Sequence, residues 1–326
     1  MGPHPAVAEV RRAVRAALPV DGRVLVACSG GADSLALAAA TAFECRDRAA
    51  ALITVDHGLQ PGSADQAVAV AAVGYELGFD PVEIVRVAVG ADGGPEAAAR
   101  VARYAALDAA ADALHASVLL GHTLDDQAET VLLGLGRGSG PRSIAGMRVV
   151  DGRYRRPFLG VRRATTLAAC DALGLTPWHD PHNADPSFQR VRLRREVLPL
   201  LEDVLQSGVA EALARTAALT QADLDALDAI AAGIVRESET LDVTDLKDQP
   251  QAIRTRVLRA WALAAGTGQL TATHIGALDA LVVGWHGQGP VDLPGGFAVR
   301  RASGRLHLQR TQRTPRTQRL RRSTEE

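Results

Sequence analysis

Lysine is almost absent from this chain of 326 residues, and Lys247 is the only one. A nucleotide-binding loop of the Walker A type needs a glycine–lysine pair, so that class of loop is excluded. Cysteine is scarce as well, and Cys28, Cys45 and Cys170 form neither a CxxC pair nor a zinc-ligand pattern. Widely spaced thiols of this kind are typical of proteins from a reducing compartment.

Long apolar runs are also missing, and no stretch reaches the roughly 20 apolar residues that a membrane-spanning helix needs. The N-terminal stretch up to Leu18 has a charged, alanine-rich helical pattern and lacks the apolar block of a signal peptide. We therefore expect a cytoplasmic protein without membrane contact. The net charge of −1 gives no overall field toward nucleic acid, so any such binding depends on local basic patches.

Strand-like and helical segments alternate through the first half of the chain. The expected strands are 24–28, 51–55, 82–87 and 118–120, and the expected helices are 33–43, 63–77, 95–114 and 124–135. This order predicts an α/β fold with a doubly wound parallel sheet and helices on both faces. Ligands bind such sheets at the carboxyl ends of the strands, and polar residues follow three of the expected strands there.

The loop after the first expected strand is glycine-rich and has the sequence Ser29-Gly30-Gly31-Ala32-Asp33-Ser34. A turn of this kind before a helix presents backbone N–H groups and the positive end of the helix dipole to an anion. Gly30 and Gly31 let the backbone approach a phosphate closely. Asp33 would repel that phosphate unless a cation lay between them, so the loop predicts a nucleotide bound with Mg²⁺.

The densest group of polar side chains follows the fourth expected strand and reads Gly121-His122-Thr123-Leu124-Asp125-Asp126-Gln127-Ala128-Glu129-Thr130. Thr123 is expected to cap the helix. If the helix extends back to His122, helical spacing puts His122, Asp126 and Glu129 on one face. Asp126 is then a candidate to share Mg²⁺ with Asp33. Glu129 is a candidate to accept a proton from an incoming amine or to hold its ammonium form, and His122 to face a phosphate. The alternative is a capped helix with a solvated acidic face.

Both motifs resemble those of the PP-loop ATP pyrophosphatases, which cleave ATP to AMP and pyrophosphate. The loop is similar to their SGGxDS signature, and residues 122–130 are similar to the HxxDDxxET motif of one branch, the tRNA(Ile)-lysidine synthetases. Further similarities follow in the same order at 55–59, 96–104, 137–147 and 156–157. The resemblance is strong over roughly residues 20–200 and weaker beyond, where 293–296 match the first C-terminal domain of the family.

The resemblance implies a ligase that uses ATP and Mg²⁺ to join free lysine to the wobble cytidine of an isoleucine tRNA with a CAU anticodon. The C2 oxygen of the cytidine attacks the α-phosphate and releases pyrophosphate, and the lysine amine then expels AMP to leave lysidine. A homodimer is also expected. The implied domains are a PP-loop catalytic domain over 1–205, a smaller, mostly helical tRNA-binding domain over 206–310, and a disordered basic tail over 311–326.

The resemblance also assigns roles to individual residues. The catalytic set is Asp33, Asp126, Glu129, His122, Arg190 and Arg194, with Asp33 and Asp126 as metal ligands. The ATP-binding set is Ser29, Gly30, Gly31, Ala32, Asp33, Ser34, Asp56, His57, Arg100 and Gly121. The expected tRNA-binding set does not rest on the resemblance: Arg103 lies on one face of an expected helix, and Arg300, Arg301 and Arg305 belong to the strongly basic C-terminal stretch. Val191 stands where the R-N-x-x-R pattern of the family has asparagine, so only the two arginines of that pattern are carried over. The alternative for Arg103 is that it lies on a solvated helix face and binds nothing. The alternative for the basic tail is that it only keeps the protein soluble.

Two other functions stay open at this level. A PP-loop tRNA thiolase would adenylate a base in the same way and then deliver sulfur, although the three cysteines offer no obvious reactive pair. A non-catalytic, ATP-dependent RNA-binding module would need the nucleotide loop but not the acidic residues Asp33, Asp126 and Glu129.

Overall fold

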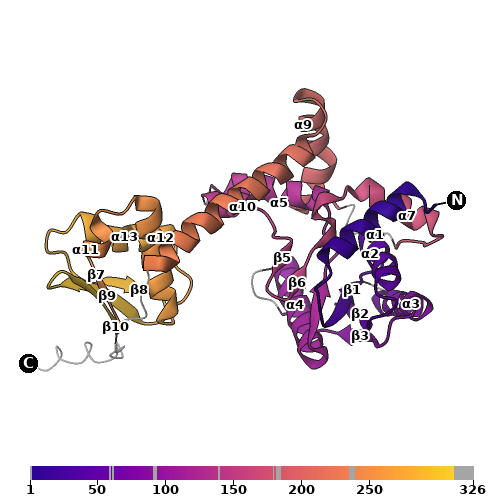
Figure 1. Ribbon diagram of the computed structural model, residues 1–326, viewed down its shortest axis with the longest axis horizontal. Helices are drawn as coiled ribbons and strands as arrows, with labels where there is room; N and C mark the ends of the chain where they lie inside the picture. Colours follow the sequence, from indigo (N-terminus) through magenta and orange to yellow (C-terminus); the bar gives the residue numbers. More distant parts are fainter. Residues whose placement is uncertain are drawn as a thin grey trace, which may run out of the picture. The chain divides into compact units, whose positions relative to one another are not determined.

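The computed structural model describes residues 2–311 except 59, 61, 91–93, 139, 179, 181–184 and 235–238, and it describes 95 and 96 by their backbone alone. The expected basic tail, apart from Thr311, lies outside these residues. The chain divides into two compact units at Gln221/Ala222, within helix α10 (Val209–Ile234) (Figure 1). Over the described ranges, no helix combines the length and the apolar character that crossing a bilayer requires.

A six-stranded sheet of mostly parallel strands forms the centre of the first unit, in the order β3-β2-β1-β4-β6-β5. Its strands are β1 (Arg23–Ala27), β2 (Ala50–Asp56), β3 (Val82–Arg86), β4 (Ala116–Leu119), β5 (Val150–Asp151) and β6 (Tyr154–Arg155). Only β5 runs antiparallel to its neighbour. The strand order reverses between β1 and β4, and in parallel sheets ligands bind beside such a reversal. The two motifs therefore follow the two strands that flank the expected binding crevice.

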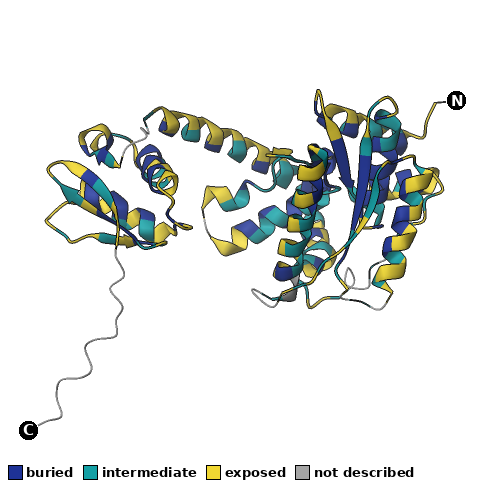
Figure 2. Cartoon of the chain, turned by 90° about the horizontal axis from the view of Figure 1, so that it is seen from below, coloured by how far each residue is buried: buried dark blue, intermediate teal, exposed yellow. Residues whose placement is uncertain are grey.

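Helices cover both faces of this sheet. The first-unit helices that shape the site are α1 (Pro5–Ala17), α2 (Ala32–Glu44), α3 (Ser63–Glu76), α4 (Pro95–Leu114), α5 (Leu124–Arg137) and α7 (Arg163–Ala172). Val24 and Val26 of β1 belong to the core that includes residues of α1, α2, α3 and α7, whereas Leu25 packs with residues of α4. Burial on both faces explains why β1 is a continuous apolar run rather than an alternating one, and Figure 2 shows this buried layer.

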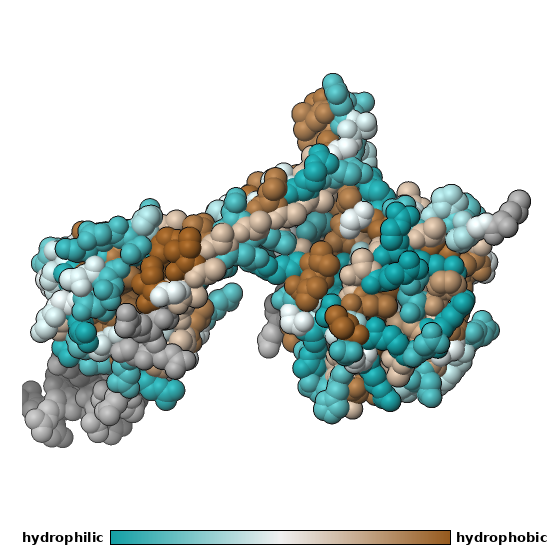
Figure 3. All heavy atoms as spheres, viewed as in Figure 1, coloured by the Kyte–Doolittle hydropathy of each residue, from teal (hydrophilic) through white to brown (hydrophobic). Residues whose placement is uncertain are grey.

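Shorter elements complete the first unit. They are α6 (Pro141–Ile144), η1 (Pro157–Gly160), α8 (Gln189–Arg192), the π-helical turn η3 (Leu193–Val197) and α9 (Leu198–Val204). A π-helical turn is rare and is often found at functional sites; here it carries Arg194. Helix α9 presents apolar side chains to solvent, and Leu200 and Val204 on it and Leu205 just after it are 60%, 66% and 63% exposed. Hydrophobic surface is visible over this helix in Figure 3.

The second unit combines helices with a four-stranded antiparallel sheet in the order β7-β10-β9-β8. Its elements are β7 (Thr240–Asp242), α11 (Thr244–Lys247), α12 (Gln251–Ala264), α13 (Ala272–Val283), β8 (Val291–Leu293), β9 (Phe297–Ala302) and β10 (Arg305–Arg310). Its core includes Leu258, Leu278 and Leu306. A buried ion pair between Arg254 and Asp279 joins α12 to α13.

Candidate functional site

The glycine-rich loop connects β1 to α2 and is closed by hydrogen bonds of Ser34. The Ser34 hydroxyl accepts from the Ser29 N–H at 3.1 Å and donates to the Gly31 carbonyl at 2.9 Å. Gly30 has a φ of +85°, and a Cβ there would lie 2.5 Å from the side chain of Gln66, so only glycine fits. Gly31 is the N-cap residue of α2, and no side chain provides a capping hydrogen bond at this helix end. The first N–H groups of α2 therefore remain available to an anion.

Helix α5 begins with a capping box. The Asp126 carboxylate accepts from the Thr123 N–H at 2.8 Å and from the Thr123 hydroxyl at 2.9 Å, while Thr123 accepts from the Asp126 N–H. The expectation that Thr123 caps the helix is confirmed. The helix starts at Leu124, as expected, so the condition under which His122 would share a helix face with Asp126 and Glu129 is not met. The helix cannot continue from Thr123 back to His122, because an N-cap residue has extended rather than helical backbone.

The two motifs meet because Gly121, after β4, packs against the first turn of α2. A Cβ on Gly121 would lie 3.1 Å from the backbone carbonyl carbon and oxygen of Asp33. This contact is tighter than ordinary packing allows for a side chain, so glycine permits the close approach of β4 to the loop. The neighbourhood of residues 29–34 and 121–129 therefore depends on the parallel pairing of β1 with β4 and on this close backbone approach at Gly121.

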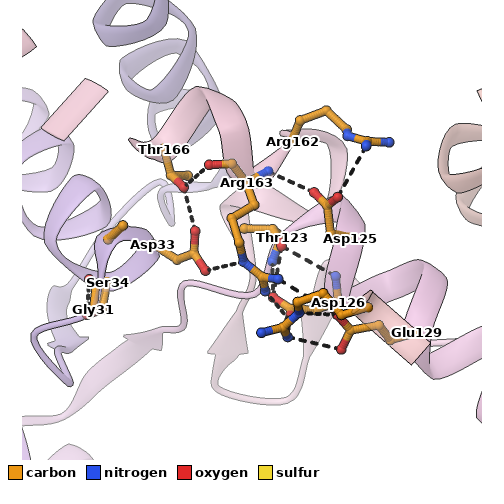
Figure 4. A network of polar contacts seen from close by, with 12 residues as sticks. Gly31, Asp33, Ser34, Thr123, Asp125, Asp126, Glu129, Arg162, Arg163 and Thr166 are labelled. Carbon is orange, nitrogen blue, oxygen red and sulfur yellow. Dashed lines mark hydrogen bonds and ion pairs between the residues drawn. The ribbon is translucent and has the colours of Figure 1, made fainter. Parts of the chain in front are cut away.

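Three acidic side chains gather around the guanidinium of Arg163 (Figure 4). Its Nε lies 3.1 Å from Asp33 Oδ2, and its Nη2 lies 2.6 Å from Asp126 Oδ1. Its Nη1 lies 3.7 Å from Glu129 Oε1. Asp33 and Asp126, which come from different helices, thus contact a single cationic group.

The two arginines expected from the sequence also contact these acids. Arg194 Nε lies 2.7 Å from Glu129 Oε1, and Arg194 Nη2 lies 3.4 Å from Asp126 Oδ1. Arg190 Nη1 lies 3.8 Å from Glu129 Oε2. Glu129 is fully buried, and a buried carboxylate needs such partners. Val191, which lies between the two arginines in the sequence, is buried, and both arginines still contact Glu129.

Arg163 and Thr166 were missed by sequence reasoning. Both lie at the start of α7, where the Arg163 N–H donates to Asp125 Oδ2 at 2.7 Å and the Thr166 hydroxyl donates to Asp33 Oδ1. The only signal was the arginine pair 162–163 shortly after the Arg156-Pro157 match. That pair does not reveal which acid each side chain reaches, because the packing of α7 against α2 decides it.

Burial and charge act on these acids in opposite directions. Burial raises the pKa of Asp33, and the neighbouring Arg163 opposes this rise. Burial also acts to raise the pKa of Asp126, but Arg163 and the hydrogen bonds from Thr123 outweigh it, so this pKa is lowered. Burial raises the pKa of Glu129 against the contact with Arg194. Burial acts to lower the pKa of Arg163, but the negative charges of the three acids outweigh this effect, so the pKa is raised.

The two carboxylates of Asp33 and Asp126 are too few to hold a divalent cation alone, and phosphate oxygens would have to supply further ligands. Among the described residues, no group of three His, Cys, Asp or Glu side chains could hold a metal, and the converging pair is Asp33 and Asp126. Mg²⁺ in nucleotide sites takes one or two carboxylates together with phosphate oxygens and water. A pair of carboxylates beside an anion-binding loop matches this requirement.

Of the remaining ATP candidates, Asp56 and His57 lie at the end of β2, whereas Arg100 lies on α4. Asp56 ends β2, is buried, and accepts from the Gly58 N–H at 2.9 Å. Next to it lies a hollow of about 560 Å³ lined by His57, Gly58, Arg86, Val87, Ala88 and Val89. Arg100 of α4 donates to the Tyr104 hydroxyl at 3.3 Å.

Arg103 and His122 also belong to this region. Arg103 is half-buried and its Nε is covered, so this side chain does not lie on a freely solvated helix face. Burial also lowers its pKa. Burial, with a smaller effect of Arg103, lowers the pKa of His122 to about 4 despite the opposing charge of Asp126. His122 is therefore a neutral imidazole at physiological pH.

The arginines expected to bind tRNA in the second unit differ in their surroundings. Arg300 is exposed on β9. Arg301 donates to the carbonyls of Leu281 and Val282 at 2.8 and 3.1 Å, at the end of α13, so it holds this helix end. Arg305 of β10 lies 3.5 Å from Asp242 and stays half-solvated.

Both parts of the chain are similar to known protein families. The sequence matches the PP-loop domain family over residues 6–201 and the family described as TilS substrate binding domain over 241–307. The tRNA(Ile)-lysidine synthase of Thermobifida fusca is 57% identical over 317 residues, which covers 94% of this chain and 98% of that protein. The protein of the same name from Streptomyces coelicolor is 53% identical over 94% of this chain and 99% of that protein.

A solved structure is similar at the level of the fold. A tRNA thiolase from Methanococcus maripaludis superimposes with a TM-score of 0.56 at 20% identity, over 66% of this chain and 80% of that one. At this identity the similarity confirms the expected PP-loop architecture and nothing about the sulfur chemistry.

Proposed function

The chain belongs to the tRNA(Ile)-lysidine synthase family, and on that premise we propose how its own residues carry out the reaction. The enzyme is a ligase that uses ATP to form lysidine on tRNA(Ile). We propose that Asp33 and Asp126 together hold Mg²⁺ against the bound triphosphate, and that free lysine is the amine donor. Their contacts with one guanidinium, at 3.1 and 2.6 Å, are the observation that carries the proposed metal site.

The first step is the attack of the cytidine C2 oxygen on the α-phosphate. Mg²⁺, when bound, neutralises negative charge on the phosphates. The free N–H groups at the start of α2 and the loop backbone bind the same phosphates, and fixed donors of this kind stabilise the charge that builds on leaving pyrophosphate. The bond from the α-phosphate to the bridging oxygen breaks as the bond to the C2 oxygen forms. The C2 oxygen thereby becomes part of a good leaving group.

The second step is the attack of the lysine amine on C2, with departure of AMP. We propose that Glu129 holds the incoming ammonium and accepts the proton that the amine must lose before it attacks. An ammonium entering this site would replace one of the guanidinium contacts of Glu129, of which Arg190 at 3.8 Å is the longest. Burial raises the pKa of Glu129, and a raised pKa suits a group that accepts a proton.

Recognition of the tRNA is divided between the two units in this proposal. A wobble cytidine is already unpaired in its loop, so presenting it to the site is less costly than flipping a paired base. We propose that Arg103 contacts the anticodon arm and that Arg300 and Arg305 of the substrate-binding domain contact phosphates elsewhere. Arg301 is left out because its described hydrogen bonds go to carbonyls of α13 and its guanidinium lies over the ring of Trp285.

We also propose a homodimer and a cytoplasmic location. The exposed apolar side chains of Leu200, Val204 and Leu205 on and just after α9 support self-association, because contiguous exposed apolar surface often marks an interface. Sedimentation of the wild type and of Leu205→Asp tests this, with a shift to monomer expected for the variant. The location follows from the substrates, since tRNA, ATP and free lysine occur together in the cytoplasm.

The reaction is tested by separating its two steps. The enzyme is incubated with ATP, Mg²⁺ and a CAU-anticodon transcript without lysine, and we expect pyrophosphate and an adenylated tRNA. Adding lysine should then release AMP and give a cytidine heavier by lysine minus water in nucleoside mass spectrometry. A transcript with uridine at the wobble position is the matched control. Pyrophosphate release that needs lysine, or that is equal with the control transcript, would contradict this order of steps.

A further inference from the structure

Arg163 contacts the same carboxylate oxygens that the proposed metal would use. Its Nε and Nη2 lie 3.1 Å from Asp33 Oδ2 and 2.6 Å from Asp126 Oδ1. A divalent ion bound to both oxygens at about 2.1 Å would occupy the position of these nitrogens and repel their positive charge. The guanidinium and the ion therefore cannot bind this pair at the same time.

In each of the two carboxylates, one oxygen accepts a hydrogen bond from a threonine and the other oxygen contacts Arg163. Thr166 donates to Asp33 Oδ1, which leaves Asp33 Oδ2 for Arg163. Thr123 donates to Asp126 Oδ2, which leaves Asp126 Oδ1 for Arg163 at 2.6 Å and for Arg194 at 3.4 Å. Fixed hydrogen bonds thus present both remaining oxygens to the Arg163 guanidinium, whereas Arg194 contacts only the oxygen of Asp126. Such pre-orientation is what a site for a small cation requires.

The backbone of Arg163 is fixed independently of these contacts. Its N–H donates to Asp125 Oδ2 at 2.7 Å, and Asp125 contacts neither Asp33 nor Asp126 in the hydrogen bonds described. The side chain remains partly exposed. Losing its carboxylate contacts would therefore free the guanidinium without moving α7, and the fixed backbone would keep it beside Asp33 and the glycine-rich loop.

We propose that Arg163 is the counter-cation of Asp33 and Asp126 in the metal-free enzyme, and that Mg²⁺ arriving with ATP displaces it toward the phosphates. This inference rests on the proposed function of the two acids. It supplies the positive charge that buried carboxylates need before the substrate binds. It also makes metal entry depend on ATP, because the ion must compete with Arg163 and find its remaining ligands on phosphate. A released guanidinium is well shaped to bind phosphate oxygens in pairs.

The test measures Mn²⁺ binding to the whole protein by electron paramagnetic resonance, with and without a non-hydrolysable ATP analogue. Without nucleotide, Arg163→Gln should bind Mn²⁺ about tenfold more tightly than the wild type or Arg163→Lys, because a competing charge is lost. Arg162→Gln is the matched control, since Arg162 pairs with Asp125 and Glu211 and contacts neither Asp33 nor Asp126 in its ion pairs. Its Mn²⁺ affinity should equal that of the wild type. Equal affinities for Arg163→Gln and the wild type would overturn the proposal.

A second measurement does not depend on the folding of that variant. The side-chain Nε–H resonance of Arg163 in the wild type, assigned by its absence in Arg163→Lys, should shift on adding the ATP analogue with Mg²⁺ but not with Mg²⁺ alone. A signal that ignores the loaded analogue would overturn the displacement. Asp33→Asn separates the two claims: if it binds Mn²⁺ with the analogue as well as the wild type does, the proposed metal site itself fails. If that variant loses Mn²⁺ while Arg163→Gln is unchanged, only the role of Arg163 fails.

Discussion

Asp33 in the first turn of α2 and Asp126 in the first turn of α5 contact the same guanidinium, at 3.1 and 2.6 Å. They meet because β1 and β4 are parallel neighbours and because Gly121 lets β4 approach the backbone of Asp33 closely. The pairing is therefore a product of sheet topology, and it connects the two sequence motifs through one site.

Neutralising either acid should abolish the first chemical step. In Asp33→Asn or Asp126→Asn, we expect pyrophosphate release with tRNA to fall by about 100-fold or more, in the range found when a charge-stabilising group is removed. Circular dichroism should show the wild-type fold. Asp112→Asn is the control, because this exposed residue of α4 pairs only with Arg153 in the ion pairs described. Normal turnover of Asp33→Asn would remove this residue from the mechanism.

Glu129→Gln should separate the two steps. The variant keeps the loop and both metal ligands, so we expect tRNA-dependent pyrophosphate release within a few-fold of wild type. Lysidine formation should be lost, or should need far more lysine, because the ammonium has no carboxylate to contact. Glu196→Gln, which loses only an exposed pair with Arg192, serves as the control. An equal loss of both steps in Glu129→Gln would place its role elsewhere.

Arg300 and Arg301 are neighbours on β9 and should respond differently to replacement by methionine. Arg300→Met should weaken tRNA binding and reduce the slope of log affinity against log salt by about one, as expected for one lost phosphate contact. Arg301→Met should instead lower the free energy of unfolding by about 1–2 kcal/mol, because two carbonyls at the end of α13 lose their donor. Salt-dependent binding and urea unfolding distinguish the two. The reverse pattern would show that the assignments are exchanged.

The buried imidazole of His122 should make stability depend on pH. Burial lowers its pKa from 6.5 to about 4, so between these values the unfolded chain binds a proton that the folded chain does not. This contribution to stability is complete above pH 6.5 and is lost as the pH falls toward 4, by up to about 3 kcal/mol. His122→Asn should flatten urea-unfolding free energies over this window. An unchanged slope in the variant would contradict the buried, neutral imidazole.

The cysteines should be dispensable for chemistry. Burial raises the pKa of Cys28 and raises that of Cys170 to about 11, and the thiolate is the reactive form. We expect slow alkylation of the folded protein at pH 8 and lysidine formation within a few-fold of wild type in Cys28→Ser/Cys170→Ser. Loss of activity with an intact fold would indicate thiol chemistry of the kind a thiolase uses.

The sequence predicted the main architecture because its signals are local. The apolar run before the loop, the glycines at 30–31 and the capping residue Thr123 each act within one turn of chain, and the helix over 95–114 is found with the expected bounds. The two-residue strands β5 and β6 are too short to show a period. Arg163 escaped because its partners are set by the packing of α7 against α2. Arg301 looked like a surface cation, and only the position of α13 gives it carbonyls to bind.

The central claim is that Asp33 and Asp126 coordinate the same divalent ion. A crystal of the enzyme grown with Mn²⁺ and a non-hydrolysable ATP analogue tests it most directly. Anomalous scattering locates the ion without ambiguity. We predict a single peak about 2.0–2.3 Å from a carboxylate oxygen of each aspartate and from a phosphate oxygen, with the guanidinium of Arg163 moved off both acids. A peak that contacts only one of the two aspartates, or an analogue bound while Arg163 still joins them, would contradict the account.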